Sequence, residues 1–315
     1  AGVRPPRFAF ESVIDSAGQI ITGAPFTVGD DSAIWADAQE KIATLREAET
    51  INQAQADALA DAARAALLDH WQPAYERLIA WQQEDIVNAS EISQGVGALP
   101  DGEAYYNERL ANQTTTDLTA DEIHQIGLDE VARLKTEMDV IKNSVGFEGD
   151  LNAFFAMLRD CKDDQRHYYP DTDEGRQAYI DDAKAAIENI KAELATYFGI
   201  LPKADLEVRR VEPFREQPGA AQHYFPGTPD GSRPGIFYYN SYDLPSRSNY
   251  GVETLFLHEA VPGHHFQVSL AQENEKLPAF QRFGGNTAFA EGWGLYAESL
   301  GPELGMFKDP YQLQG

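Results

Sequence analysis

Residues 258–265 hold three of the chain's seven histidines and one glutamate, and they contain Pro262 followed by Gly263. Imidazole nitrogens and carboxylate oxygens are preferred zinc ligands where cysteine is scarce, and this chain has one cysteine, Cys161. Proline and glycine both disfavour the interior of a helix. A fold for this chain therefore has to place a cluster of metal-binding side chains at a point where a helix is distorted.

The spacing within this run differs from that of the common zinc-protease signature. In H-E-x-x-H, two histidines four residues apart share one face of a helix, and the glutamate after the first activates water. His264 instead lies six positions after His258, which on a regular helix is about 9 Å along the axis and about 120° around it. We therefore predict a bulge at Pro262 and Gly263 that restores the arrangement His-Glu-Ala-Val-His, with Glu259 beside the first ligand.

The second ligand has an alternative. His265 lies seven positions after His258 and returns to the same helix face, but about 10 Å along the axis, so it requires a larger distortion. We predict His264 as the ligand and His265 as a group that supports a ligand or faces the substrate. A histidine pair beside a proline is also compatible with the simple end of a helix. The mostly apolar helical neighbours of Glu259 favour the metal site, because an ionised carboxylate in such surroundings needs a partner.

Residues 287–298 form a second predicted helix, in which Glu291 is the candidate third ligand. Its helical neighbours are small or apolar, which would let another helix approach closely and would leave the carboxylate uncompensated. Glu298, two turns further on, is either a support for a ligand histidine or an ordinary solvated glutamate. The predicted apolar stripe of this helix comprises Phe289, Trp293, Tyr296 and Leu300.

Helical periodicity dominates the N-terminal two thirds of the chain. We expect helices, the second kinked at Pro73, at residues 31–46, 51–81, 119–143 and 174–198. The pattern then alternates, and we expect strands at residues 206–211 and 235–240. We therefore divide the chain into a helical region, residues 1–200, and a catalytic region, residues 201–315, which together form one continuous structural unit.

Several segments resemble a known bacterial family. The run HEAVPGHHFQ is preceded by RPGIFYYNS, at residues 233–241, and followed by FAEGWGLYAESLG, at residues 289–301. The likeness extends to GVRPPRF, LPDGEAYYNERL and TADEIHQIGLDEV, so it covers essentially the whole chain. The chain resembles the family catalogued as domain of unknown function 885, many of whose members are named as lipoproteins.

This resemblance implies a mainly α, zincin-like helical metallopeptidase fold with a small β-sheet near the active site. The implied fold is similar to that of the carboxypeptidase Taq family and, more distantly, to angiotensin-converting enzyme and dipeptidyl peptidase III. The family pattern makes His258, His264 and Glu291 the ligands of one Zn²⁺ ion per chain, and Glu259 the general base. Because family members are longer at both ends, we expect this chain to be part of a longer protein. The resemblance also implies a periplasmic location, or a lipid anchor on the full-length precursor.

The strand expected before the metal-binding helix suggests how a substrate binds. Zincins bind an extended peptide by adding it to a sheet edge, so Tyr238, Tyr239 and Asn240 are candidate substrate contacts. Tyrosines that pack a half-buried strand have the same pattern. His223, on the turn-rich approach to this strand, is a candidate donor to the oxyanion.

The net charge is −26, from 51 acidic and 25 basic residues, which argues against binding of nucleic acid or an anionic membrane through a basic face. No apolar run approaches the ~18 residues that span a bilayer. We therefore expect a peptide as the partner and a zinc-dependent peptidase as the function. Two alternatives share the same residues: a noncatalytic periplasmic binding or scaffold protein that retains the zincin shell, and a metal-dependent hydrolase of nonpeptide amides or esters.

Overall fold

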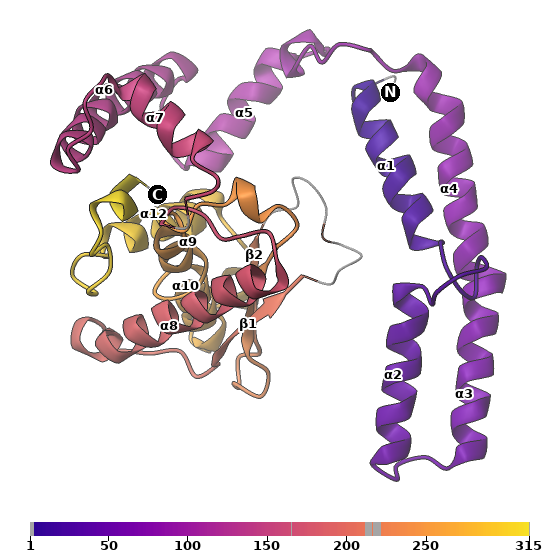
Figure 1. The fold of residues 1–315 in the computed structure, drawn as a ribbon. Helices are drawn as coiled ribbons and strands as arrows, with labels where there is room; N and C mark the ends of the chain where they lie inside the picture. Colours follow the sequence, from indigo (N-terminus) through magenta and orange to yellow (C-terminus); the bar gives the residue numbers. More distant parts are fainter. Residues whose placement is uncertain (1–2, 165, 212–215, 217–221, 315) are drawn as a thin grey trace. The chain divides into compact units, whose positions relative to one another are not determined.

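The computed structural model describes residues 3–164, 166–211, 216 and 222–314 (Figure 1). The chain forms two compact units, Ala1–Tyr106 and Asn107–Gly315. Both units are mainly helical, and the three strands lie in the second. The boundary expected near residue 200 lies inside the second unit, where the long helix α8 (Asp173–Tyr197) is followed by the sheet.

The first unit is built from helix pairs, in which α1 packs along α4 and α2 along α3 (Figure 1). The predicted helices at residues 31–46 and 51–81 are confirmed. The predicted irregularity near Pro73 is a π-helical turn just before it, which fits a residue that has no N–H to donate. The helical elements are α1 (Arg7–Ile20), α2 (Ala33–Glu47), α3 (Gln53–Ala66), η1 (Leu67–Trp71), α4 (Gln72–Asp85), η2 (Ile86–Asn88) and η3 (Val96–Ala98), and α5 (Gly102–Thr114) crosses the division.

The second unit contains the two other helices predicted from periodicity. Thr119 and Glu122 form a capping box, in which each side chain accepts the backbone N–H of the other, and this begins α6. No described helix is long and apolar enough to cross a membrane. Besides α8, the helical elements are α6 (Ala120–Ser144), α7 (Leu151–Asp160), η4 (Leu244–Ser246), α9 (Val252–Glu259), α10 (His264–Glu273), α11 (Ala279–Phe283), α12 (Thr287–Ser299) and η5 (Pro310–Gln314).

The sheet has the strand order β1-β3-β2, with β1 at Leu206–Arg210, β2 at His223–Phe225 and β3 at Gly235–Tyr239. β1 is parallel to β3, and β2 is antiparallel to it with Tyr224 opposite Phe237. β3 is therefore the central strand, and almost all of its residues are buried. The strands expected at residues 206–211 and 235–240 are confirmed, whereas β2 was not predicted.

The main hydrophobic core of the second unit joins α8, β3 and α9. Phe237 of β3 and Phe256 of α9 are fully buried, and their rings pack edge to face with centroids 5.2 Å apart. Burial of a phenylalanine side chain contributes roughly 1.5–3 kcal/mol. This packing fixes α9, whose last two residues are His258 and Glu259.

Candidate metal centre

The helix is interrupted where Pro262 and Gly263 predicted a distortion. α9 ends at Glu259 and α10 begins at His264, so the distortion is a four-residue turn and is larger than the predicted bulge. The backbone N–H of His265 donates to the carbonyl oxygen of Ala260 at 3.2 Å, and this hydrogen bond closes the turn. The turn brings the first residue of α10 back beside the last turn of α9.

Two contacts hold this turn in place. A β-carbon on Gly263 would overlap the carbonyl oxygen of His258, so the close approach requires glycine. The indole N–H of Trp293, in α12, donates to the carbonyl oxygen of Pro262 at 2.7 Å. This hydrogen bond ties the turn to α12, which also carries Glu291.

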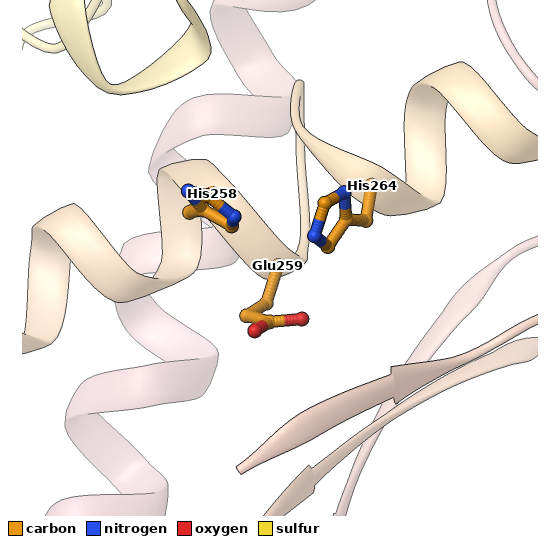
Figure 2. Close-up of side chains that lie close together, drawn as sticks. All are labelled: His258, Glu259 and His264. Atoms are coloured by element: carbon orange, nitrogen blue, oxygen red, sulfur yellow. The ribbon is translucent and has the colours of Figure 1, made fainter. Parts of the chain in front are cut away.

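The turn brings His258, Glu259 and His264 together (Figure 2). One possible ligand atom from each lies within 4.8 Å of the others, and all three residues are half-buried. The two imidazole rings are nearly perpendicular, with centroids 4.6 Å apart. Within the described part of the chain, no other group of three such residues is arranged to hold a metal ion.

Glu291 extends this group from α12. Its Oε2 lies 3.3 Å from Nε2 of His258, and its Oε1 lies 3.8 Å from Nε2 of His264. Two ligands bound to one zinc ion at about 2.1 Å in a tetrahedral arrangement lie about 3.4 Å apart. The 3.3 Å distance between His258 and Glu291 therefore matches that of two zinc ligands, and the 3.8 Å distance to His264 is slightly longer. Glu291 lies beside the group of His258, Glu259 and His264 without being one of the three residues within 4.8 Å of one another.

Glu298 lies behind His258 and is not an isolated solvated glutamate. Its Oε1 accepts a hydrogen bond from Nδ1 of His258 at 2.6 Å, which leaves Nε2 directed toward Glu291. This hydrogen bond raises the pKa of His258, and the charge of Glu298 adds to the effect, against the opposing effect of burial. A carboxylate on the far nitrogen is the usual support of a metal-binding histidine, since it fixes the tautomer and the orientation of the ring.

α12 approaches His258 through a glycine, and only half of its predicted apolar stripe, Trp293 and Leu300, packs against the core. Phe289 and Tyr296 of that stripe are 57% and 52% exposed, whereas Gly294 is buried. A β-carbon on Gly294 would lie 2.6 Å from Cε1 of His258. Only glycine fits at position 294, because the imidazole of His258 occupies the space that a side chain would need. The close approach of the two helices also brings Glu291 to this imidazole.

Glu259 is held by the sheet. Its Oε2 accepts the backbone N–H of Tyr224, in β2, at 3.1 Å. This N–H is thus directed to α9 and not to the neighbouring strand β3. The contact holds an acceptor-only carboxylate beside the two imidazoles, in a position to take a proton.

His265 is not part of the cluster. It is 2% exposed, its Nε2 lies 3.1 Å from the carbonyl oxygen of Ala204, and its Nδ1 lies 3.0 Å from the hydroxyl of Tyr224. Burial lowers its pKa to about 4, so it is neutral at pH 7. His264 is therefore the candidate ligand of the two, and His265, expected to support a ligand or to face the substrate, is buried against Ala204 and Tyr224. Successive residues of a helix point about 100° apart, so His264 faces the candidate metal centre while His265 faces the sheet.

Two of the three predicted substrate contacts on residues 235–240 are buried side chains. Tyr239 and Asn240 are each 1% exposed, and Tyr239 packs against Tyr179 in the core. Tyr238 stacks on His223, with ring centroids 5.2 Å apart. Because β3 is paired on both sides, its backbone has no free edge to which a peptide could add.

Three residues that shape the site were not predicted as such: Tyr224, Trp293 and Gly294. β2 has three residues, too few for alternation to reveal a strand. The small residues around Glu291 did indicate a close helix approach, but Trp293 was taken as part of a stripe and not as a hydrogen-bond donor to the turn.

Comparison with known proteins identifies the family. The model of the family described as "Bacterial protein of unknown function (DUF885)" matches residues 1–315. The chain belongs to this family. No curated protein matches this DUF885 chain.

Two solved structures are similar to this DUF885 chain. "The crystal structure of the putative lipoprotein from Colwellia psychrerythraea" has 28% identity and a TM-score of 0.87, and the match covers 98% of this chain and 52% of that one. A "putative lipoprotein of unknown function from Shewanella oneidensis" has 17% identity and a TM-score of 0.54, covering 98% of this chain and 54% of that one, and this shows the fold alone. The chain spans about half the length of both proteins.

Proposed function

We propose that this DUF885 protein is a zinc-dependent peptidase of the zincin type, with Glu259 as the general base. The observation that carries the proposal is the meeting of two imidazoles and two carboxylates where α9, α10 and α12 approach one another. His258, His264 and Glu291 would hold one Zn²⁺ ion. Two nitrogen ligands and one oxygen ligand are typical of catalytic zinc sites in peptidases, which keep a further position open.

The donor set fits zinc in chemistry as well as in spacing. Zinc requires neutral imidazoles, and the hydrogen bond from Nδ1 of His258 to Glu298 leaves Nε2 as the nitrogen available for a ligand bond. When bound, zinc supplies Lewis acidity, which lowers the pKa of water toward neutrality and polarises a carbonyl.

Glu259 performs the proton transfers in this proposal. Its carboxylate lies within 4.8 Å of both imidazoles and approaches them from α9, whereas Glu291 approaches them from α12. It accepts a proton from the attacking water and delivers this proton to the leaving nitrogen. The backbone N–H of Tyr224 keeps the carboxylate oriented for both steps.

A peptide is the proposed substrate, because the edge strand β2 lies next to Glu259 through the Tyr224 contact. An extended chain that binds near this edge would have its scissile bond close to the general base. We also propose a periplasmic or lipid-anchored location, because the 28% identical protein from Colwellia psychrerythraea is described as a lipoprotein.

The test compares Glu259→Gln with the wild type and with Glu275→Gln, an exposed glutamate beyond the end of α10. Each zinc-loaded protein is incubated with the peptides of a digested protein, and products are detected by mass spectrometry. Glu259→Gln is expected to keep its zinc and to lose about 100-fold or more of the hydrolysis rate, because proton transfer by a positioned base contributes roughly 10²–10⁴-fold. Glu275→Gln should behave as the wild type.

Two outcomes would contradict the proposal. A fully active Glu259→Gln protein would exclude this glutamate as the base. A wild-type protein that binds zinc and cleaves no peptide would favour either a noncatalytic binding protein or a hydrolase of other amides or esters, which p-nitrophenyl esters and anilides would distinguish.

A further inference from the structure

His264 and His265 begin the same helix, yet only the first faces the candidate metal centre. The imidazole of His265 is buried between α10 and the sheet, and both of its nitrogens have partners. A buried imidazole whose two nitrogens are both engaged is held in one orientation. One of these partners, Tyr224, also forms a hydrogen bond with Glu259 of the candidate metal centre.

The first part of this path is a directional hydrogen bond. The carbonyl oxygen of Ala204 can only accept, so Nε2 of His265 carries the hydrogen and Nδ1 is the acceptor. The hydroxyl of Tyr224, 3.0 Å away, therefore donates to Nδ1. Burial raises the pKa of this hydroxyl, while the side chain of Ser269 and the backbone of Gly227 act in the opposite direction. The tip of Tyr224 therefore lies in a buried and polar environment.

The second part is the backbone of the same tyrosine. The N–H of Tyr224 donates to Oε2 of Glu259 at 3.1 Å. One residue therefore connects His265, through its hydroxyl, with the proposed general base, through its amide. β2 has only three residues and pairs with β3 on one side, so its place relative to α9 and α10 depends on such side-chain contacts.

The packing around this pair leaves no room for another arrangement. A β-carbon on Gly235, in β3, would lie 2.5 Å from Nδ1 of His265 and 2.7 Å from the hydroxyl of Tyr224. The rings of Tyr224 and His265 meet edge to face, with centroids 5.5 Å apart. β3 therefore packs directly against the side chains of both Tyr224 and His265.

We propose that His265 is a positioning residue for Glu259 and acts through Tyr224. Its Nδ1 fixes the Tyr224 side chain, which fixes β2, whose amide orients the carboxylate of Glu259. This role rests on the proposed function, in which Glu259 is the base. It gives the second histidine of the pair a role at the candidate site without a place among the candidate ligands.

The test uses two substitutions of His265 that each keep one of its hydrogen bonds. In His265→Asn the side-chain amide lies where Nδ1 was, so an acceptor for Tyr224 is kept and the donor to Ala204 is lost. In His265→Gln the amide lies where Nε2 was, so the donor is kept and the acceptor is lost. Tyr224→Phe removes the hydroxyl alone and provides a third variant in case both histidine variants fail to fold.

The first measurement is hydrogen exchange of individual backbone amides by NMR in the zinc-loaded proteins. Exchange at the Tyr224 amide should become about tenfold faster or more in His265→Gln and Tyr224→Phe, and less so in His265→Asn, because a bond to a charged acceptor is lost. Exchange at the Phe237 amide, in the central strand, is the control and should not change. Equal effects of Asn and Gln, or an unchanged Tyr224 amide in Tyr224→Phe, would overturn the proposal.

The second measurement separates positioning from stability. In peptide cleavage, kcat should fall about tenfold or more in His265→Gln and Tyr224→Phe with zinc content retained and KM little changed. A purely structural residue would lower Tm and leave kcat per folded molecule unchanged, and that result would overturn the proposal. If the zinc-loaded wild type cleaves no peptide, the proposed function fails, while amide exchange still decides whether His265 positions Glu259.

Discussion

The first unit and the second unit bury their side chains in different ways. In the first unit the buried hydrophobic residues are few and scattered over separate helix pairs, as with Phe10 in α1 and Trp35 in α2. In the second unit a continuous core joins α8, β3 and α9. The candidate metal centre lies at the C-terminal end of α9, directly after Phe256 and Leu257, which this core buries completely. The comparison suggests why candidate metal ligands can lie beside the break between α9 and α10: the core immobilises α9, the half before the break.

The largest expected effect tests the core itself. Phe256→Ala should lower the free energy of unfolding of the second unit by about 3–5 kcal/mol, because it removes a fully buried ring and leaves a cavity. Leu59→Ala, in α3 of the first unit, is the control, since Leu59 is 44% exposed and should cost less than ~1 kcal/mol. Urea denaturation followed by tryptophan fluorescence and circular dichroism measures both. Equal costs would remove the contrast between the units.

A second prediction concerns the approach of α12 to α9. Gly294→Ala should weaken zinc binding by about 100-fold or more, because the added β-carbon would displace the imidazole of His258. Gly292→Ala is the matched control on the same helix, since nothing lies within 4 Å of a β-carbon there. That substitution should leave zinc affinity unchanged and slightly stabilise the helix. Zinc affinity is measured by competition with a chromophoric chelator, and equal effects would contradict the described packing.

A third prediction concerns Glu298. Glu298→Gln should lower zinc affinity roughly 10–100-fold, the usual cost of losing the carboxylate that supports a ligand histidine. Glu303→Gln, on an exposed residue nearby in sequence, should have no effect. A wild-type affinity in Glu298→Gln would mean that the hydrogen bond to His258 does not orient the ligand.

The raised pKa of His258 also gives zinc binding a pH dependence. Zinc must displace the proton that Glu298 stabilises on His258, so affinity should begin to fall at a higher pH than an ordinary histidine of pKa about 6.5 would cause. In the metal-free protein the same pair contributes stability that is fully present below about pH 6.5 and is lost as the pH rises through the raised pKa. Glu298→Gln should shift the pH dependence of zinc affinity to lower pH. An unshifted profile would contradict the assignment.

The sequence predicted the parts of the fold that depend on periodicity and capping. α6 begins at the capping box of Thr119, and α8 follows its apolar spacing. The helix distortion at Pro262 and Gly263 was also predictable, because both residues disfavour a helix for local reasons. Its extent was not, since the turn is held by contacts from α12, which lies further along the chain.

The sequence predicted that His258, Glu259 and His264 come together, because Pro262 and Gly263 interrupt the helix between them, and the structure groups these three residues. The burial of His265 was not predicted, because the direction of its side chain depends on how α10 packs against the sheet. Tyr224 acts through its backbone, and a backbone N–H carries no sequence signal. Half of the predicted stripe of α12 packs against the core, at Trp293 and Leu300, whereas Phe289 and Tyr296 are exposed and the close approach to His258 requires Gly294.

The most direct test of the central claim is the zinc content of the purified chain after dialysis without chelator, measured by elemental analysis beside three single variants. We predict about one zinc ion per chain in the wild type and in His265→Ala, and none in His258→Ala or His264→Ala. No zinc in the wild type after zinc is added, or zinc retained in His258→Ala and His264→Ala, would contradict the assignment of this cluster as a metal centre.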